Sequence, residues 1–277
     1  MMRILITNDD GIHSPGLEIL ADAFRNLGEV TIVAPDTEQS AVGHSITISH
    51  PLRVKEIQKN GELFGYAVNG TPADCIKIAV GTIMHHKPHL VVSGINQGLN
   101  IGTNVIYSGT VSGAMEGAIL GLPALSVSMD VDFHYKNNDS YQRIFSFPAT
   151  FCVMLAKLVL ENGLPERTLL NINFPSCPTD EIRGIAVTKQ GQTVFRDRFQ
   201  KRLDPRQNVY YWLEGEDEEM ESEGGDSQDF IAIKKGYISI TPLWSDLTNY
   251  GCIERLKCWD LSLNLKETFT LFGQSKR

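Results

Sequence analysis

The sequence predicts an α/β fold, in which a mostly parallel sheet is covered by helices and followed by a β-rich C-terminal extension. Strand-like and helix-like segments alternate over residues 1–174, and polar loops containing glycine follow the apolar strands. After residue 174 the alternation gives way to short strand-like runs joined by long polar loops. We therefore expect a core domain at 1–174 and an extension at 175–277 that packs on the core or on a second subunit.

The elements of the predicted core follow from apolar periodicity. Apolar runs predict strands at 3–7, 30–34, 90–93, 124–128 and 169–174. Helical spacing predicts helices at 15–24, 71–83, 110–120 and 141–161. The second helix has the strongest start signal, because Thr71 offers a capping hydroxyl, Pro72 suits the first turn and Asp74 is acidic. Two β-branched runs around Asn60-Gly61 predict a hairpin inserted into this alternation.

The extension is predicted from weaker signals. Strand-like runs occur at 185–188, 209–212, 230–233 and 237–240, and a final helical pattern covers 261–272. Between two of these runs, residues 214–229 hold nine acidic side chains and no Lys or Arg. We interpret this acidic segment as a solvated loop.

Composition limits the classes of function. The chain has 277 residues, 42% hydrophobic and 21% charged, as is usual for a globular protein. Its net charge of −8 comes from the acidic segment, because the rest of the chain has 25 basic and 24 acidic residues. We find no basic tract, so we expect no binding of nucleic-acid duplexes.

The cysteines and the apolar runs predict the compartment. Five cysteines are scattered without a CxxC pair, which favours a reducing environment over a disulfide framework. No stretch approaches eighteen uninterrupted apolar residues, and the N-terminus reads as a strand, not as a signal peptide. We therefore expect a cytoplasmic protein with no membrane contact.

Three polar loops mark the candidate site. They cover 8–16, 35–45 and 94–110, each after a predicted parallel strand. Ligands of open α/β sheets bind at the carboxyl ends of the strands, so the three loops should converge. No GxGxxG, GxxxxGK[ST] or GxSxG motif occurs, which excludes dinucleotide-binding, P-loop and α/β-hydrolase sites of the usual kind.

The adjacent carboxylates Asp9 and Asp10 are the sharpest feature of these loops. One interpretation is a helix N-cap with a solvated neighbour. The functional alternative is a hard divalent cation, with the Ser40 hydroxyl and the Asn96 amide oxygen completing its ligands. Two carboxylates would cancel the charge of such a cation, so that a phosphate dianion could approach it. Oxygen ligands favour Mg²⁺ or Mn²⁺.

A second part of the candidate site is the turn Ser108-Gly109-Thr110. It stands where a loop becomes the N-terminus of the helix predicted at 110–120, where free amides and hydroxyls can bind an anion. His13 and His44 also lie in the site loops. Each is either a proton donor to a leaving group or a loop hydrogen bonder, and we favour the second interpretation.

The order of the motifs resembles one known family. The motifs are Ile-Thr-Asn-Asp-Asp-Gly at 6–11, Ala-Pro-Asp with Gln-Ser at 34–40, Gly-His-Ser-Ile-Thr at 43–47, Asn-Gly-Thr-Pro-Ala-Asp-Cys at 69–75, Ser-Gly-Ile-Asn-Gln-Gly-Leu-Asn at 93–100, Tyr-Ser-Gly-Thr-Val-Ser-Gly-Ala at 107–114 and Gly-Tyr-Ile-Ser-Ile-Thr-Pro-Leu at 236–243. With these, the sequence resembles the survival protein SurE family over nearly its whole length.

The resemblance implies a metal-dependent phosphomonoesterase that acts on nucleoside 5′- and 3′-monophosphates, and in some members on polyphosphate ends. It implies a Rossmann-like catalytic core and a homodimer or homotetramer in which C-terminal elements are exchanged. Asp9, Asp10, Ser40 and Asn96 match the family's ligands for one divalent cation per subunit, and residues 108–110 match its phosphate-contacting turn.

We accordingly expect Asp9 and Asn96 to be catalytic. The main alternative is a metal-dependent nucleotide-binding stress protein that does not hydrolyse its ligand. A sugar-nucleotide transferase is a third reading, but it usually needs a larger second lobe for the acceptor.

Overall fold

The computed structural model describes residues 2–219, 227–259 and 261, and the chain divides into two compact units. The first unit ends at Trp244 and the second begins at Ser245. In the second unit the described helix is α7 (Tyr250–Lys257), whose N-terminus is capped by the Asn249 side chain. The helix predicted at 261–272 lies, apart from Leu261, outside the described residues.

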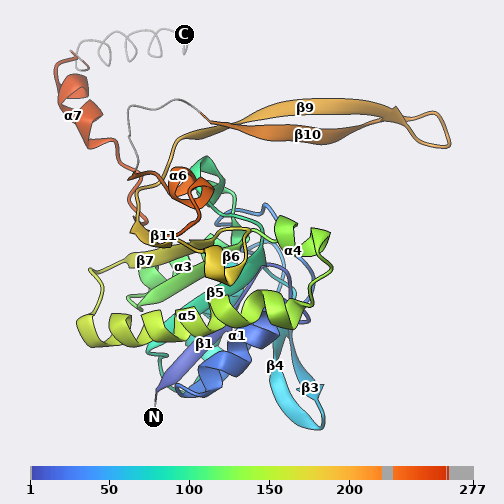
Figure 1. Cartoon of the computed structure of the whole chain (residues 1–277), viewed down its shortest axis with the longest axis vertical. Coiled ribbons are helices and arrows are strands. Elements are labelled where there is room, and N and C mark those ends of the chain that lie inside the picture. Colours follow the sequence, from blue (N-terminus) through green and yellow to red (C-terminus); the bar gives the residue numbers. More distant parts are fainter. Residues whose placement is uncertain (1, 220–226, 260, 262–277) are drawn as a thin grey trace, which may run out of the picture. The chain divides into compact units, whose positions relative to one another are not determined.

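The first unit is built on a nine-stranded mixed sheet with the order β3-β4-β2-β1-β5-β6-β7-β11-β8 (Figure 1). Its strands are β1 (Arg3–Thr7), β2 (Glu29–Pro35), β3 (Val54–Lys59), β4 (Glu62–Val68), β5 (Leu90–Gln97), β6 (Ala124–Met129), β7 (Thr168–Phe174), β8 (Gly184–Val187) and β11 (Tyr237–Trp244). All neighbouring pairs from β4 to β7 are parallel, whereas β3 and β11 pair antiparallel with β4 and β7. The predicted mostly parallel α/β sheet is therefore confirmed.

Helices cover both faces of this sheet. They are α1 (Pro15–Arg25), α2 (Pro72–Ile78), α3 (Gly109–Ile119), α4 (Asp132–Lys136), α5 (Tyr141–Asn162) and α6 (Asp229–Lys234), with a π-helical turn at Ala79–Ile83 and 3₁₀ turns at Gly102–Ile106 and Thr179–Glu181. Figure 1 shows α1 and α5 on one face and α3 on the other. The predicted capping box of α2 is present, with Thr71 and Asp74 bonding each other's backbone amides.

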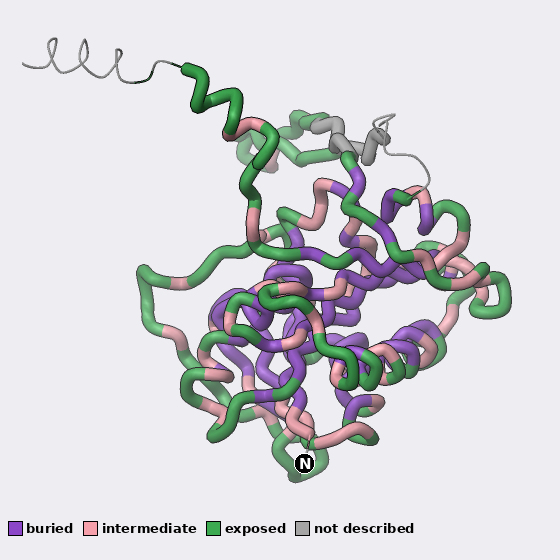
Figure 2. The backbone as a smooth tube through the Cα atoms, turned by 90° about the vertical axis from the view of Figure 1, so that its left-hand side faces the viewer, coloured by how far each residue is buried: buried purple, intermediate pink, exposed green. Residues whose placement is uncertain are grey.

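Two hydrophobic layers hold the helices to the sheet. Ile4 and Ile6 of β1 pack toward α1 and α5, while Leu5 between them packs toward α2 and α3. Strands buried on both faces are apolar at nearly every position, which is why residues 4–6 of this strand read as a continuous apolar run. Figure 2 shows the buried residues concentrated in the interior of this unit.

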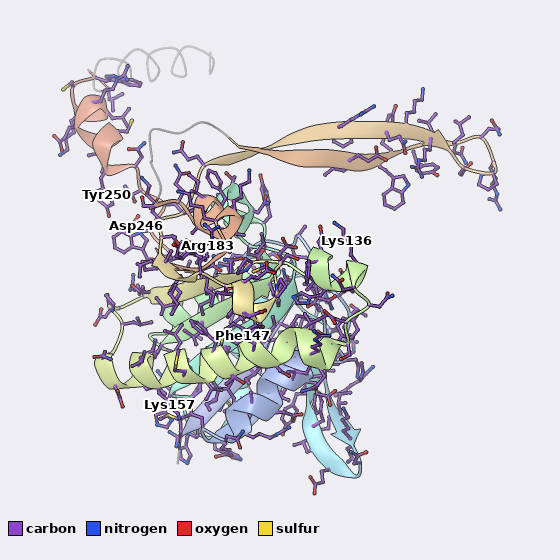
Figure 3. The ribbon with its side chains drawn as sticks, viewed as in Figure 1. Lys136, Phe147, Lys157, Arg183, Asp246 and Tyr250 are labelled. Atoms are coloured by element: carbon purple, nitrogen blue, oxygen red, sulfur yellow. The ribbon has the colours of Figure 1, made fainter. Side chains whose placement is uncertain are left out.

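Helix α5 is long and apolar enough to span a bilayer by length and composition, although core helices pass the same test. Its buried residues include Phe145 and Cys152, which belong to the layer over β5 and β6. Phe147, labelled in Figure 3, makes ring contacts with Phe151 and with Phe174 of β7. These contacts identify α5 as a helix of the core.

The predicted hairpin forms as β3 and β4, and it stands between β2 and α2 in the chain. Residues Tyr66–Val68 of β4 pair with Val33–Pro35 of β2, so the hairpin extends the main sheet.

The extension differs from the prediction at residues 230–233 and in the acidic segment. Residues 230–233 form helix α6 and not a strand, because four consecutive apolar residues have no diagnostic period. The acidic segment is not simply a solvated loop: Glu214–Glu219 belong to strand β10 (Val209–Glu219), and Asp229 is fully buried. Residues 220–226 of that segment lie outside the described part.

Strand β9 (Thr193–Leu203) pairs antiparallel with β10 in a separate two-stranded sheet, and sequence reasoning missed it. Beyond residue 174, β8 and β11 continue the main sheet. The domain boundary at 174/175 stays a prediction.

Candidate active site at the carboxyl ends of β1, β2 and β5

A tight turn after β1 positions the two aspartates. Asn8 is fully buried, and its amide group accepts a hydrogen bond from the Gly11 N–H at 3.2 Å and donates one to the Gly11 carbonyl at 3.1 Å. Gly11 has a φ of +98°, which glycine adopts without a steric penalty. Asp9 and Asp10 are held inside this turn.

Asp9 is hydrogen-bonded to the N-terminus of α3. Its Oδ2 accepts a hydrogen bond from the Thr110 N–H at 3.0 Å, and its Oδ1 accepts one from the Thr110 hydroxyl. The neighbouring Gly109 leaves room for this contact, since a Cβ there would lie 2.7 Å from the Cβ of Asp9. Loops one and three of the prediction therefore meet at Asp9.

Burial and mutual repulsion govern the two carboxyl groups. Burial raises the pKa of Asp9, although hydrogen bonds from Thr110 and from its own backbone amide work in the opposite direction. Burial, then Asp9 and then Glu38 raise the pKa of Asp10 to about 7. Within the described part of the chain, the buried Asp10 Oδ2 has no hydrogen-bond partner. A buried carboxylate oxygen without a donor is the environment that a cation would satisfy.

Ser40 reaches the site on the loop after β2. The Gln39 N–H donates to the Asp9 carbonyl at 2.8 Å, and the Gly43 N–H donates to the Tyr107 carbonyl at 2.9 Å. Ser40 itself is exposed, and its hydroxyl donates to Glu38 Oε1 at 2.5 Å. The loop path brings Ser40 to the edge of the site, together with the carboxylate of Glu38, which no sequence motif marks.

Asn96 lies near the end of β5, the strand next to β1. Its amide nitrogen donates to the Gly98 carbonyl at 2.9 Å, so its amide oxygen stays available as a ligand. Together with Asp9, Asp10 and Ser40 it would supply only oxygen donors, the set that Mg²⁺ and Mn²⁺ prefer.

The three residues of the turn at 108–110 make different contacts at the N-terminus of α3. The Ser108 Oγ accepts from the Val111 N–H at 3.1 Å and caps α3, which leaves the hydroxyl hydrogen of Ser108 free to donate. Thr110 is committed to Asp9 through both its amide and its hydroxyl. The Gly109 amide, at the first helical position, has no intrahelical acceptor.

His44 belongs to an ion-pair cluster and not to the carboxylate pair. Its Nε2 lies 2.9 Å from Oε2 of the buried Glu116 on α3, and Lys77 of α2 lies 3.1 Å from the other oxygen. Burial alone would raise the pKa of Glu116, but hydrogen bonds from His44 and Lys77 hold it below its ordinary value. His13 is exposed. The structure thus supports our interpretation of His44 as a loop hydrogen bonder.

In the part of the chain that the structure describes, no three His, Cys, Asp or Glu side chains form a metal-binding group. The predicted ligand set is of a different kind, since two of its four members are Ser and Asn.

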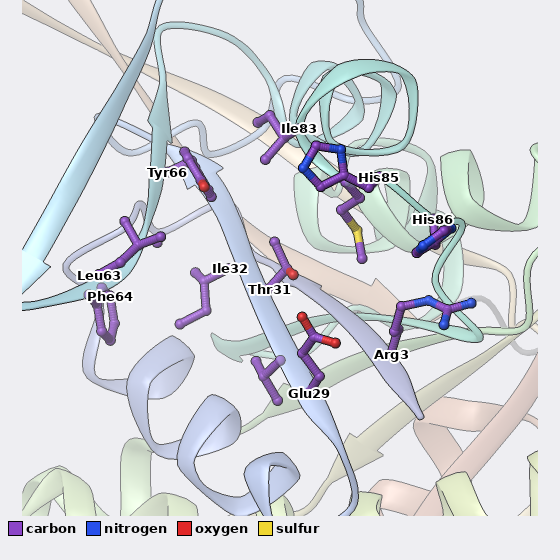
Figure 4. Close-up of a pocket in the computed structure, with 13 residues that line it drawn as sticks. Arg3, Glu29, Thr31, Ile32, Leu63, Phe64, Tyr66, Ile83, His85 and His86 are labelled. Carbon is purple, nitrogen blue, oxygen red and sulfur yellow. The ribbon is translucent and has the colours of Figure 1, made fainter. Parts of the chain in front are cut away.

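A cavity of about 350 Å³ lies at the amino ends of the strands, away from the candidate site. It is lined by Arg3 and Glu29 at the starts of β1 and β2 and by His85 and His86 (Figure 4).

Fold and site together define an α/β protein with paired carboxylates facing the N-terminus of a helix. The model of the survival protein SurE family matches residues 4–197, and the chain belongs to this family. The chain is similar to proteins named 5′-nucleotidase SurE from Syntrophobacter fumaroxidans (47% identity over 260 residues, 94% of this chain and 100% of the relative) and Geobacter sulfurreducens (44% over 261 residues, 94% and 95%). It also resembles the crystal structure of the SurE protein from Aquifex aeolicus, with a TM-score of 0.75 and 42% identity, covering 92% of this chain and 98% of that one.

Proposed function

We propose that the protein is a metal-dependent phosphomonoesterase that hydrolyses nucleoside 5′- and 3′-monophosphates to a nucleoside and phosphate. The observation that carries the proposal is the carboxylate pair: Asp9 is hydrogen-bonded to the N-terminus of α3, and Asp10 has one buried oxygen without a donor among the described residues. The similarity to proteins named 5′-nucleotidase supports nucleotides as the substrate class. Hydrolysis of polyphosphate ends is part of the proposal as a secondary activity.

Asp9, Asp10, Ser40 and Asn96 would hold one Mg²⁺ or Mn²⁺ per subunit. A cation there supplies Lewis-acid chemistry, which neutralises charge developing on a phosphoryl oxygen. Asp10 contributes its unpartnered Oδ2, and Asn96 its free amide oxygen. Ser40 would have to exchange its hydrogen bond to Glu38 for this role, so we expect it to be the weakest of the four ligands.

The α3 N-terminus would bind the remaining phosphoryl oxygens. The Gly109 amide and the Ser108 hydroxyl are oriented donors, and the helix dipole favours negative charge at this end. Thr110 acts through Asp9, which it holds by two hydrogen bonds. Asp9 and Asn96 are the groups that we propose to orient the attacking water, because they lie on adjacent strand ends.

Phosphate release from nucleoside monophosphates tests this proposal. We expect turnover with Mn²⁺ or Mg²⁺, none with a chelator, and a loss of more than about 1,000-fold in Asp9→Asn. Lys157→Ala, an exposed change on α5 (Figure 3), is the matched control. Full activity in Asp9→Asn would refute the assignment, and binding of nucleotide without phosphate release would favour a non-hydrolytic binding protein.

A homodimer or homotetramer is the assembly that we propose, with the β9–β10 hairpin as a contact. A two-stranded hairpin is marginally stable alone, and this one exposes Phe199, Tyr211, Trp212 and Leu213. Sedimentation of the wild type and of a Tyr211→Ser/Trp212→Ser variant tests this assembly, with dissociation expected for the variant.

The proposed location is the cytoplasm, in keeping with five free cysteines, and we propose no membrane or nucleic-acid duplex as partner.

A further inference from the structure

A cavity of about 500 Å³ opens at the same edge of the sheet as the carboxylate pair. Its lining comes from the loop after β5, from the segments that follow β6 and β7, and from α6. The apolar part consists of Leu99, Ile101, Pro175, Phe230 and Ile233. Cavities of this size, mostly apolar with a few polar groups, are typical of small-molecule sites.

The cavity wall formed by Leu99 and Ile101 is rigid because Asn100 between them is locked. The Asn100 N–H donates to Asn173 Oδ1 at 2.8 Å, and its side-chain amide donates to Ser128 Oγ at 2.8 Å. The amide groups of Asn171 and Asn173 both donate to the Asn100 carbonyl. The loop is thereby fixed across the ends of β6 and β7.

The opposite wall is tied to the same loop. Asp229, the first residue of α6, accepts hydrogen bonds from the Gly102 N–H at 2.9 Å and from the Gly191 N–H at 3.0 Å. This fully buried carboxylate sets the position of α6, and with it Phe230 and Ile233, relative to Ile101. The cavity is therefore a formed site held by buried polar contacts on both sides.

Its position relative to the carboxylate pair fits the length of a nucleotide. Asp9 follows β1, Asp130 follows β6 and Pro175 follows β7, in the sheet order β1-β5-β6-β7. At a strand spacing of about 4.8 Å, Asp130 and Pro175 lie about 10 and 14 Å along the edge from Asp9. From phosphorus to the base nitrogen a nucleotide spans about six bonds of about 1.5 Å, roughly 7 Å, and the base extends further.

From these observations we propose that this cavity is the subsite for the nucleobase of the substrate, an inference that rests on the proposed phosphomonoesterase function. The base lies between the Leu99 and Ile101 side chains and the α6 side chains Phe230 and Ile233. Asp130 stands at the near end, where a ribose hydroxyl would donate to its carboxylate. Asp130 Oδ1 already accepts from the Asp132 N–H at 3.2 Å, which leaves Oδ2 for this contact.

Steady-state kinetics of Leu99→Trp, which fills the cavity from a half-buried position, tests the proposal. We expect the KM for adenosine and uridine 5′-monophosphates to rise more than tenfold, while the KM for ribose 5-phosphate, which lacks a base, changes less than twofold. Leu63→Trp, an exposed position in β4 at the distant cavity, is the matched control and should change neither KM. If Leu99→Trp does not fold, Leu99→Ala replaces it, with an expected rise of three- to tenfold for the nucleotides only.

Adenosine binding to the metal-free protein, measured by calorimetry, gives an independent readout. Leu99→Trp should weaken it more than tenfold. Equal KM changes for nucleotides and ribose 5-phosphate, or no change for either, would overturn the subsite while leaving the phosphomonoesterase intact. The subsite would also be overturned if Leu99→Trp changed the sedimentation coefficient but left the nucleotide preference unchanged. A second chain would then occupy the cavity. Absence of phosphate release from every ester would instead count against the proposed function.

Discussion

Thr110 donates to both carboxylate oxygens of Asp9, with its amide at 3.0 Å from Oδ2 and its hydroxyl bonded to Oδ1. The strand end that carries the acidic pair and the helix end that would bind phosphate are thus one hydrogen-bonded unit. Displacing either partner should disturb both halves of the site.

Thr110→Val should therefore impair activity without unfolding the protein. The substitution keeps the shape and the amide bond but removes the hydroxyl, so Asp9 loses one of its two fixed contacts. We expect kcat/KM for a nucleoside monophosphate to fall about 10- to 100-fold, as for the loss of a positioning contact. Thr110→Ser restores the hydroxyl and should recover most of the activity; equal defects in the two variants would contradict this role.

Asp10→Asn should stabilise the metal-free protein at alkaline pH. The pKa of Asp10 is raised to about 7, so the folded state keeps its proton between about pH 4 and 7 while the unfolded state releases it. The buried carboxyl thus lowers wild-type stability as pH rises through that window. Urea unfolding with a chelator should show Asp10→Asn more stable than wild type at pH 8 and equal at pH 3. If Asp10→Asn were less stable than wild type at pH 8, the ionised Asp10 carboxylate would not be an uncompensated charge in the folded protein.

Glu116→Ala should destabilise the fold more than the loss of a surface ion pair. Glu116 is buried and bonds both His44 and Lys77, so its removal deletes two side-chain contacts of a buried carboxylate. We expect a loss of about 1.5–3 kcal/mol in the free energy of unfolding, as for hydrogen bonds to a charged group, against about 0–1 kcal/mol for Glu18→Ala in the exposed Lys59 pair. Similar losses for the two variants in urea titrations would show that the cluster is not structurally important.

Asp74 should make stability sensitive to acid. Burial would raise its pKa, but hydrogen bonds from Thr47 and Thr71 together bring it below the ordinary value. The stabilisation is therefore complete above about pH 4 and is lost as pH falls through the lowered pKa. Asp74→Ala should lower the urea midpoint at pH 7, and its deficit relative to wild type should shrink toward pH 2. A deficit independent of pH would exclude an ionised cap.

Sequence alone could place the site loops because their arrangement depends on topology. Buried parallel strands such as β1 and β5 read as apolar runs, and their carboxyl ends meet at one edge of the sheet. The contacts within the site could not be read in this way. Glu38 enters through the path of an irregular loop, and the partnership of Thr110 with Asp9 joins residues 101 positions apart.

The C-terminal half was harder to predict for a related reason. Residues 230–233 form a helix whose position depends on the contacts of Asp229 with Gly102 and Gly191, which lie far away in the sequence. The acidic segment reads as solvent-facing from composition, yet its last residue is buried and its first residues are in a strand. Composition describes a segment on average and does not identify the single carboxylate that tertiary hydrogen bonds place in the interior.

The most direct measurement is the anomalous scattering of crystals grown with Mn²⁺. We expect one strong peak per chain between the carboxylates of Asp9 and Asp10, within ligand distance of Ser40 and Asn96, and no peak there in Asp10→Asn. A wild-type map with Mn²⁺ peaks at other places on the protein and none beside these carboxylates would contradict the proposed metal site.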